Sequence, residues 1–233
     1  MESIEELRKI CQDKGYKEHP TLRFYRIFSI YITRFFLVLG LRRPEPIVVL
    51  GFLSGIVGGY LYLRGLFLWG SVFFFLFMIL DHVDGEIARY RKLVTIFGGW
   101  LDAVSGHLLY PYFFLTLGLG TFIKTGVYWY IVLGVIAAIA KLIERSVSQF
   151  ATTENNQDSP KIRESNSLKS WFSHIGKGMV LYLVILICSI LGWEKYFLWF
   201  FSIYLVILAL GKVVLTGQRI YFAEKKQKIN FKL

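Results

Sequence analysis

The sequence predicts an all-α integral membrane protein with six transmembrane helices, preceded by an amphipathic helix at the cytoplasmic interface. Hydrophobic residues make up 55% of the 233 residues, only 18% are charged, and the mean hydropathy is +0.51. A soluble domain of this length carries more charge. Six apolar runs follow one another, each long enough to cross a bilayer, which needs about 20 residues per helix. Lys and Arg gather in alternate connections between these runs.

The charge and the cysteine content narrow the possible partners. A formal charge of +11 would favour nucleic acid in a soluble chain, but in a chain this apolar it favours anionic lipid, and we expect no nucleic-acid partner. Cys11 and Cys188 lie far apart, so neither a disulfide framework nor a cysteine zinc site is indicated. Residues 1–15 contain no apolar run, so we expect no cleavable signal peptide.

Residues 21–41 form the first predicted membrane-associated helix. Three arginines and Thr33 share one face of a helical wheel, which is typical of a helix lying in the membrane interface. The alternative, a first transmembrane span, would place Arg34 in hydrocarbon. We expect the helix to end at the polar, proline-containing segment 42–46.

The predicted spans are defined by their apolar composition and are separated by short connections, with one exception. The polar residues 151–170 read as a solvated loop between the fourth and fifth spans. The spans cover residues 46–63, 65–88, 93–120, 125–145, 175–193 and 196–216. The predicted domains are a cytoplasmic leader with the interfacial helix (1–44), a six-helix transmembrane domain (45–218) and a basic cytoplasmic tail (219–233).

The basic residues also predict the orientation of the chain in a cell membrane. Lys and Arg are frequent before residue 44, at 89–92, at 145–177 and after 212. The loops on the opposite side hold only Arg64, Lys124 and Lys195. By the positive-inside rule, both termini are expected to be cytoplasmic.

Acidic residues inside the second and third spans indicate a functional site. Ionisable groups at this depth are costly, and they commonly mark sites of function. Asp81 and Asp84 share a helix face with Arg89, and Asp102 lies on a similar stripe of the next helix. Clustered carboxylates repel unless a cation neutralises them, and an all-oxygen site favours Mg²⁺ or Mn²⁺.

Two other interpretations of these acids stay open. They could pair with Arg89, Arg91 and Lys92 in a structural ion network, although this would not explain their joint spacing. They could also mark the pathway of a metal-ion transporter, which would leave Gly85 and Ala88 unexplained.

Residues 81–106, DHVDGEIARYRKLVTIFGGWLDAVSG, closely resemble the signature D-x2-D-G-x2-A-R-x8-G-x3-D-x3-D of the CDP-alcohol phosphotransferase (phosphatidyltransferase) family. Seven positions match at the right intervals: Asp81, Asp84, Gly85, Ala88, Arg89, Gly98 and Asp102. The predicted six spans and interfacial helix are similar to the small bacterial and archaeal members, so the likeness covers about residues 20–218.

The resemblance implies a membrane enzyme of phospholipid synthesis. It would transfer a phosphatidyl-type group from a CDP-alcohol, with CDP-diacylglycerol or an ether analogue as the expected donor, to a hydroxyl acceptor, and release CMP. The reverse arrangement, from a CDP-linked polar alcohol to a lipid, stays open. By position, Asp81, Asp84 and Asp102 would bind one or two Mg²⁺ or Mn²⁺ ions, and Gly85, Ala88 and Arg89 would contact the CDP moiety. The resemblance also implies a homodimer, a bacterial or archaeal cell membrane and a cytoplasmic active site.

One position departs from the signature. The fourth aspartate of the family, a metal ligand and candidate base, is Gly106 here, and the adjacent His107 is a candidate substitute base. The chain could be an active enzyme with another base, a homologue that binds CDP and lipid without catalysis, or a sequence with an inactivating change. Lys141 and Arg145 are expected to bind a phosphorylated or acidic acceptor, unless Glu144 simply pairs with one of them.

Overall fold

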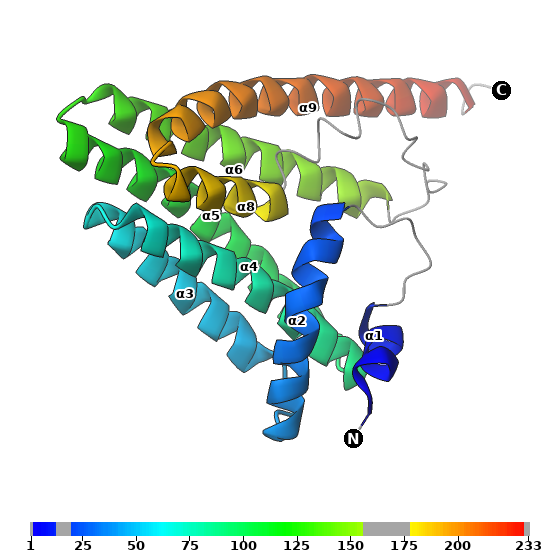
Figure 1. The fold of residues 1–233 in the computed structure, drawn as a ribbon. Helices are drawn as coiled ribbons and strands as arrows, with labels where there is room; N and C mark the ends of the chain where they lie inside the picture. Colours follow the sequence, from blue (N-terminus) through cyan, green and yellow to red (C-terminus); the bar gives the residue numbers. More distant parts are fainter. Residues whose placement is uncertain (1, 13–19, 156–177, 231–233) are drawn as a thin grey trace.

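The computed structural model describes residues 2–12, 20–155 and 178–230, and every regular element within these ranges is an α-helix (Figure 1). Helices α1 and α2 lie at the N-terminal end, and the other described helices form the body of the molecule. In chain order the helices are α1 (Ile4–Gln12), α2 (Pro20–Val38), α3 (Glu45–Leu63), α4 (Phe67–Tyr90), α5 (Ile96–Thr125), α6 (Trp129–Asn155), α8 (Gly178–Ile190) and α9 (Glu194–Asn230).

Local sequence signals define both ends of α5, the helix that carries Asp102. The hydroxyl of Thr95 caps the N-terminus of α5 by accepting a hydrogen bond of 3.0 Å from the Gly98 amide. At the other end Gly126 adopts a φ of 73°, a left-handed conformation that glycine takes at little cost, and closes the helix.

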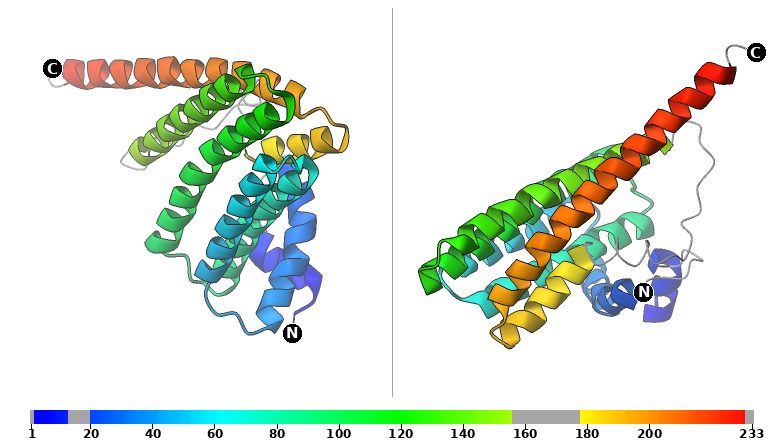
Figure 2. Two further views of the ribbon diagram at one scale, coloured as in Figure 1. Left: turned by 90° about the vertical axis from the view of Figure 1, so that its left-hand side faces the viewer. Right: turned by 90° about the horizontal axis from the view of Figure 1, so that it is seen from above.

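The long helices pack as antiparallel hairpins. Helices α3 and α4, α5 and α6, and α8 and α9 are joined by short turns that lie at the same end of the molecule (Figure 1). Helix α9 packs along α6 and extends beyond the other helices towards the C-terminus (Figure 2). The opposite end carries α1 and α2, which both pack against α4.

Glycines bring α5 and α6 into backbone contact. A Cβ on Gly118 would lie 2.5 Å from the Tyr130 carbonyl oxygen, and one on Gly134 would lie 2.7 Å from that of Phe114. Real Cβ atoms do not approach so closely, so both positions require glycine. Small residues that admit a neighbouring backbone are typical of helix contacts in membranes.

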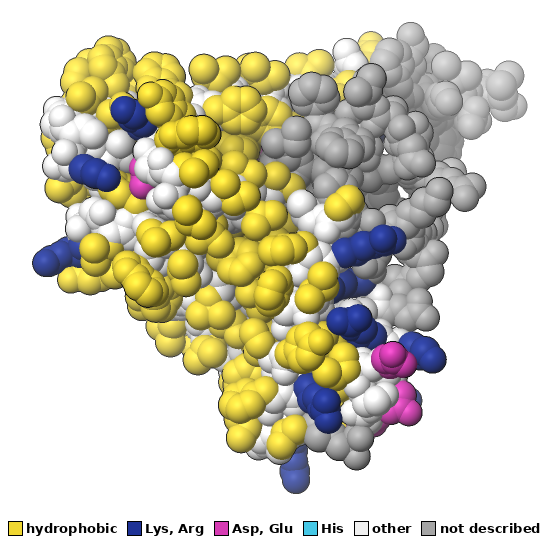
Figure 3. Space-filling view, viewed as in Figure 1, with side chains coloured by type: hydrophobic (Ala, Val, Ile, Leu, Met, Phe, Trp, Pro, Cys, Tyr) yellow, Lys and Arg dark blue, Asp and Glu magenta, His cyan; other side chains and the backbone are white. Residues whose placement is uncertain are grey.

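Several helices have the length and composition of membrane spans. Four of the described helices meet both criteria, namely α3, α4, α5 and the Glu194–Tyr221 part of α9, and α8 is a shorter apolar helix. Hydrophobic side chains cover most of the face shown in Figure 3, and Lys, Arg and acidic residues lie near its margins. The fold class of a helical membrane protein is therefore confirmed, and the count of six spans stays a prediction.

Part of the polar face predicted for helix α2 is turned towards the protein, whereas Arg23 is exposed and Arg34 is intermediate. Arg26, Ser29 and Thr33 are buried, whereas Tyr31 and Phe35 are more than half exposed. The helix thus presents polar groups to α4 and apolar groups outward. Its location at the membrane interface stays a prediction.

The structure differs from the expected boundaries at three places. Residues 4–12 of the leader form a helix, which was not predicted. Helix α6 continues through Asn155, so the predicted loop at 151–170 was wrong in its first five residues, and residues 156–170 lie outside the described ranges. Helix α9 runs without a break through Asn230, past the predicted start of the tail at 219.

Candidate functional site

The structure brings the three acids of the motif together between α4 and α5. Asp81 and Asp84 are one turn apart on α4, and Asp102 projects from the second turn of α5. The carboxyl groups of Asp81, Asp84 and Asp102 are close enough to interact electrostatically. The shared metal site predicted for these carboxylates across a helical hairpin stays a prediction.

The donor chemistry of this acid cluster, defined as Asp81, Asp84 and Asp102, fits a divalent cation. All of its donors are carboxylate oxygens, which Mg²⁺ and Mn²⁺ prefer. Among the residues whose side chains the structure describes, no three acidic, His or Cys groups converge closely enough to hold a metal ion. The cluster therefore has the right ligand type for a divalent cation.

Arg89 of the motif is held by the N-terminal helix. Its Nε donates a hydrogen bond of 2.5 Å to the carbonyl of Cys11, in the last turn of α1. A Cβ on Gly85 would lie 3.2 Å from Nη1 of Arg89, so this glycine leaves room for the guanidinium. Ala88, the third expected nucleotide contact, is partly exposed beside them.

Glu86 is a buried carboxylate that joins three helices. It is 1% exposed and accepts hydrogen bonds from Gln12 Nε2 (2.7 Å), Ser29 Oγ (2.6 Å) and Thr33 Oγ1 (2.6 Å). These donors come from α1 and α2, so Glu86 fixes both helices beside the motif. The sequence alone does not indicate this role of Glu86, because its donors are distant in sequence.

The space at position 106 is taken by Arg145. Gly106 lies on α5 one turn after Asp102, and it is buried. A Cβ there would lie 2.6 Å from Cζ and 2.9 Å from Nη1 of the Arg145 guanidinium, which reaches across from α6. Cζ of Arg145 also lies 5.1 Å from the centre of the Tyr110 ring, a cation–π distance.

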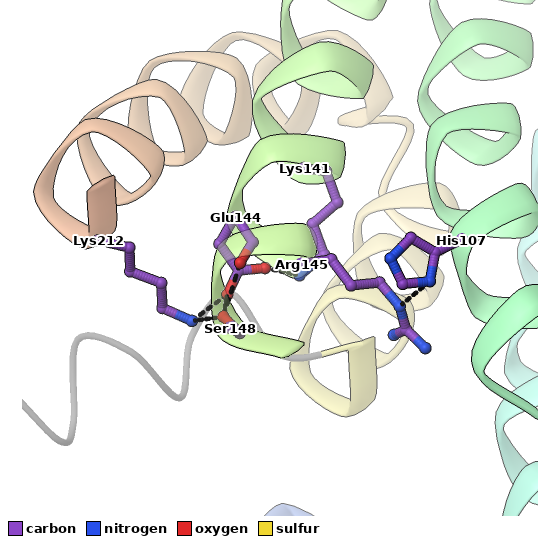
Figure 4. A network of polar contacts seen from close by, with 6 residues as sticks. All are labelled: His107, Lys141, Glu144, Arg145, Ser148 and Lys212. Carbon is purple, nitrogen blue, oxygen red and sulfur yellow. Dashed lines mark hydrogen bonds and ion pairs between the residues drawn. The ribbon is translucent and has the colours of Figure 1, made fainter. Parts of the chain in front are cut away.

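The two histidines of the motif region have local partners. His107 Nδ1 lies 2.8 Å from the Ala103 carbonyl and 3.2 Å from Arg145 Nε (Figure 4). The first contact needs a protonated Nδ1 and the second an unprotonated one, so only one forms at a time. His82 Nδ1 contacts the Met78 carbonyl at 2.7 Å, and its ring stacks on Tyr25. The role of His107 as a base stays a prediction.

A second polar cluster connects α6 with α9. Glu144, which is 6% exposed, pairs with Lys141 Nζ at 2.7 Å and with Lys212 Nζ (Figure 4). Lys212 Nζ also donates to Ser148 Oγ at 2.7 Å. The pairing of Glu144 with Lys141 was one of the two sequence alternatives. Lys212 was missed, although a lysine inside the apolar run 196–216 was a detectable signal.

Both clusters open into one cavity of about 480 Å³. Its lining includes Asp81 from the acid cluster, Tyr110 between the clusters, and three cations from α6 and α9, namely Lys141, Arg145 and Lys212. The lining also contains two carboxylates, those of Asp81 and Glu144. Such a cavity can hold a polar, anionic ligand next to the acids.

Comparison with known proteins identifies relatives of this site and fold. The sequence profile of the CDP-alcohol phosphatidyltransferase family matches residues 41–199, which include the whole motif. A curated relative, the phosphatidylinositol phosphate synthase of Streptomyces avermitilis, is 33% identical over 86 residues. That match covers 35% of this chain and 35% of the relative, so it spans about a third of the relative's length.

Solved structures with a similar fold include phosphatidylinositol phosphate synthase of Mycobacterium tuberculosis. The form with CDP-DAG bound has a TM-score of 0.58 and 20% identity, and the match covers 83% of this chain and 92% of that one. The form in complex with manganese and citrate has a TM-score of 0.56 and 20% identity, with 83% and 88% coverage. At this identity the likeness shows the fold alone.

Proposed function

Because this chain belongs to the CDP-alcohol phosphatidyltransferase family, we propose that it transfers a phosphatidyl-type group from a CDP-alcohol to a hydroxyl acceptor and releases CMP. The proposed donor is CDP-diacylglycerol or an ether analogue, and the M. tuberculosis structure with bound CDP-DAG supports this choice. The proposed setting is phospholipid synthesis at the cytoplasmic face of a cell membrane, by a homodimer.

The observation that carries this proposal is the placement of the motif. Seven signature residues lie on two neighbouring helices, and Asp81 lines a cavity that also contains basic residues. A structural ion network would bring the acids against Arg91 and Lys92, but both of these side chains are exposed. Arg89 donates to a backbone carbonyl.

In this proposal the residues of the site divide into donor and acceptor groups. Asp81, Asp84 and Asp102 hold Mg²⁺ or Mn²⁺, which when bound neutralises phosphate oxygens and the departing CMP. Gly85, Ala88 and Arg89 contact the CDP moiety, where the small residues permit close approach to the helix.

We assign the acceptor to the basic half of the cavity. Lys141 and Lys212 flank Glu144, and Arg145 lies between them and the acid cluster. This excess of positive charge favours an acceptor that carries a phosphate or another anionic group. The name of the S. avermitilis relative is consistent with a phosphorylated polyol.

The direct test is CMP release by the purified protein with CDP-diacylglycerol and Mn²⁺. The acceptor panel contains glycerol 3-phosphate, inositol, inositol 1-phosphate and serine. We expect release with a phosphorylated acceptor, and a loss of about 10²-fold or more in Asp102→Asn, the scale for removing one charge-stabilising group. Glu5→Gln, an exposed carboxylate on α1, is the matched control and should keep full activity.

A second candidate function is favoured by the missing carboxylate at position 106. A homologue that binds CDP-alcohol without turnover would show Mn²⁺-dependent CDP binding, abolished in Asp102→Asn, and no CMP release with any acceptor. CMP release by the unmodified chain would exclude it. Metal flux in proteoliposomes with no CDP binding would instead support a transporter.

The acceptor assignment has its own expected outcome. Lys141→Met should raise the KM for the acceptor by about tenfold, equivalent to 1.4 kcal/mol, and leave CDP binding unchanged. Lys124→Met removes the same charge from the exposed C-terminal end of α5 and should change neither value. Equal acceptor KM values in the two variants would contradict the assignment.

A further inference from the structure

The geometry at position 106 makes a side chain there incompatible with the observed place of Arg145. The guanidinium occupies the volume that a Cβ would need, with Cζ at 2.6 Å and Nη1 at 2.9 Å from it. Because Gly106 follows Asp102 by one helical turn, this volume lies on the same face of α5 as that acid. The glycine therefore admits a cation from α6 to the edge of the acid cluster.

The contacts of Arg145 hold its guanidinium beside α5. Its Nε points to His107 at 3.2 Å (Figure 4), and its Cζ lies 5.1 Å from the centre of the Tyr110 ring. The guanidinium is close enough to Asp81 to interact with it electrostatically. Glu144, the neighbouring acid on α6, is engaged by Lys141 and Lys212 instead.

We propose that Arg145 is a resident cation of the acid cluster, and that Gly106 is the residue that lets it reach this place. Its guanidinium balances part of the negative charge of Asp81 and Asp102 when these carboxylates are close together. A bound divalent ion must then share the cluster with a fixed positive charge, so Arg145 weakens divalent-ion binding. Arg145 acts through the carboxylates and is therefore a positioning residue. The inference rests on the metal assignment of the proposed function.

Two different substitutions test this role without an activity assay. Arg145→Met removes the charge, whereas Gly106→Ala keeps the arginine and displaces its guanidinium by a single methyl group. We expect both to tighten Mn²⁺ binding to the purified full-length protein by about tenfold, within the usual range of coupling between two sites. Isothermal titration without substrate measures this affinity.

Three further variants serve as controls for the change in Mn²⁺ affinity. Arg145→Lys keeps the charge and should stay near the affinity of the unmodified chain. Arg91→Met removes an exposed arginine that bonds to the Leu41 carbonyl, and it should leave Mn²⁺ affinity unchanged. Asp102→Asn should abolish Mn²⁺ binding. Thermal unfolding of each variant reports folding separately, since a purely structural arginine would alter stability and not Mn²⁺ affinity.

The outcomes separate this inference from the proposed function. Unchanged Mn²⁺ affinity in both Arg145→Met and Gly106→Ala, with binding lost in Asp102→Asn, would overturn the role of Arg145 and keep the metal site. Mn²⁺ binding that survives Asp102→Asn would overturn the metal assignment and the inference together.

Discussion

Glu86 shows how one buried charge can organise the surroundings of a site. A carboxylate that is 1% exposed is costly unless hydrogen bonds satisfy its oxygens, and here the amide of Gln12 and the hydroxyls of Ser29 and Thr33 do so. Arg26 adds an electrostatic contribution nearby. Since Glu86 is two residues after Asp84, the packing of α1 and α2 is tied to the position of the acid cluster.

The residue-scale prediction concerns Glu86→Gln. An amide at this position would turn one acceptor into a donor facing other donors, so we expect a loss of about 1–3 kcal/mol in the free energy of unfolding. Denaturant unfolding of the purified protein in detergent measures the loss. Glu5→Gln makes the same chemical change on the exposed face of α1 and should have little effect. Equal stability of the two variants would exclude the proposed role of Glu86.

At the scale of elements, few contacts hold α1 against the other helices. The reactivity of Cys11 reports whether these contacts are formed. Its buried face presents Leu7 and Cys11, and the Cys11 carbonyl accepts the hydrogen bond from Arg89. Burial raises the pKa of the Cys11 thiol from 9.0 to about 11. A thiol is reactive as its thiolate, so the docked helix protects Cys11 from alkylation.

Alkylation of Cys11 in a Cys188→Ser background therefore measures the docking of α1. We expect slow reaction with iodoacetamide at pH 8 and faster reaction in Arg89→Gln. Because the folded pKa is raised, the thiol stabilises docking below pH 9, and this contribution is lost as the pH rises towards 11. Rapid alkylation of the unmodified helix at pH 8 would show that α1 is not docked as described.

The ends of several helices were predictable because local signals define them. The expected spans 46–63 and 65–88 lie within two residues of α3 and α4 at both ends, since apolar runs there stop at prolines, glycine or charges. Helix α1 was missed although the sequence carries signals for it, since Leu7 and Cys11 lie one turn apart and Ser3 and Glu6 form a capping box at its start.

Much of the site was predictable from one motif, and the rest depended on packing. Helical spacing places Asp81 and Asp84 on one face of α4, so their shared side of the helix could be predicted from sequence. Arg145 reaches the acid cluster only because α6 packs against a glycine of α5, and Lys212 joins Glu144 across 68 residues of sequence. The spacing of residues within one helix does not predict contacts between residues that are far apart in the chain.

At the scale of the whole molecule, the turns define two ends with different chemistry. The turns 64–66, 126–128 and 191–193 lie together at one end, and the connection 91–95 lies at the other (Figure 1). In a membrane these ends face opposite sides. The basic segments predict that the end with residues 91–95 faces the cytoplasm.

Single cysteines in a cysteine-free background test this orientation. A membrane-impermeant maleimide added to intact cells should label Arg64→Cys and Lys124→Cys, and should label Arg91→Cys only after the membrane is permeabilised. Labelling of Arg64→Cys and Arg91→Cys from the same side would contradict the arrangement. The outcome does not depend on enzymatic activity.

The backbone contact between Gly118 and Gly134 has a consequence for the register of the two helices. Gly106 lies 12 residues before Gly118, and Arg145 lies 11 residues after Gly134, so the two antiparallel arms have nearly equal lengths of about 17 Å at 1.5 Å per residue. The glycine contact and the contact of Arg145 with Gly106 are therefore separated by nearly the same distance along both helices. Inserting one residue into either arm would rotate the part of the helix beyond it by about 100°. This rotation would move the guanidinium away from the volume beside Gly106, even if each helix remained intact.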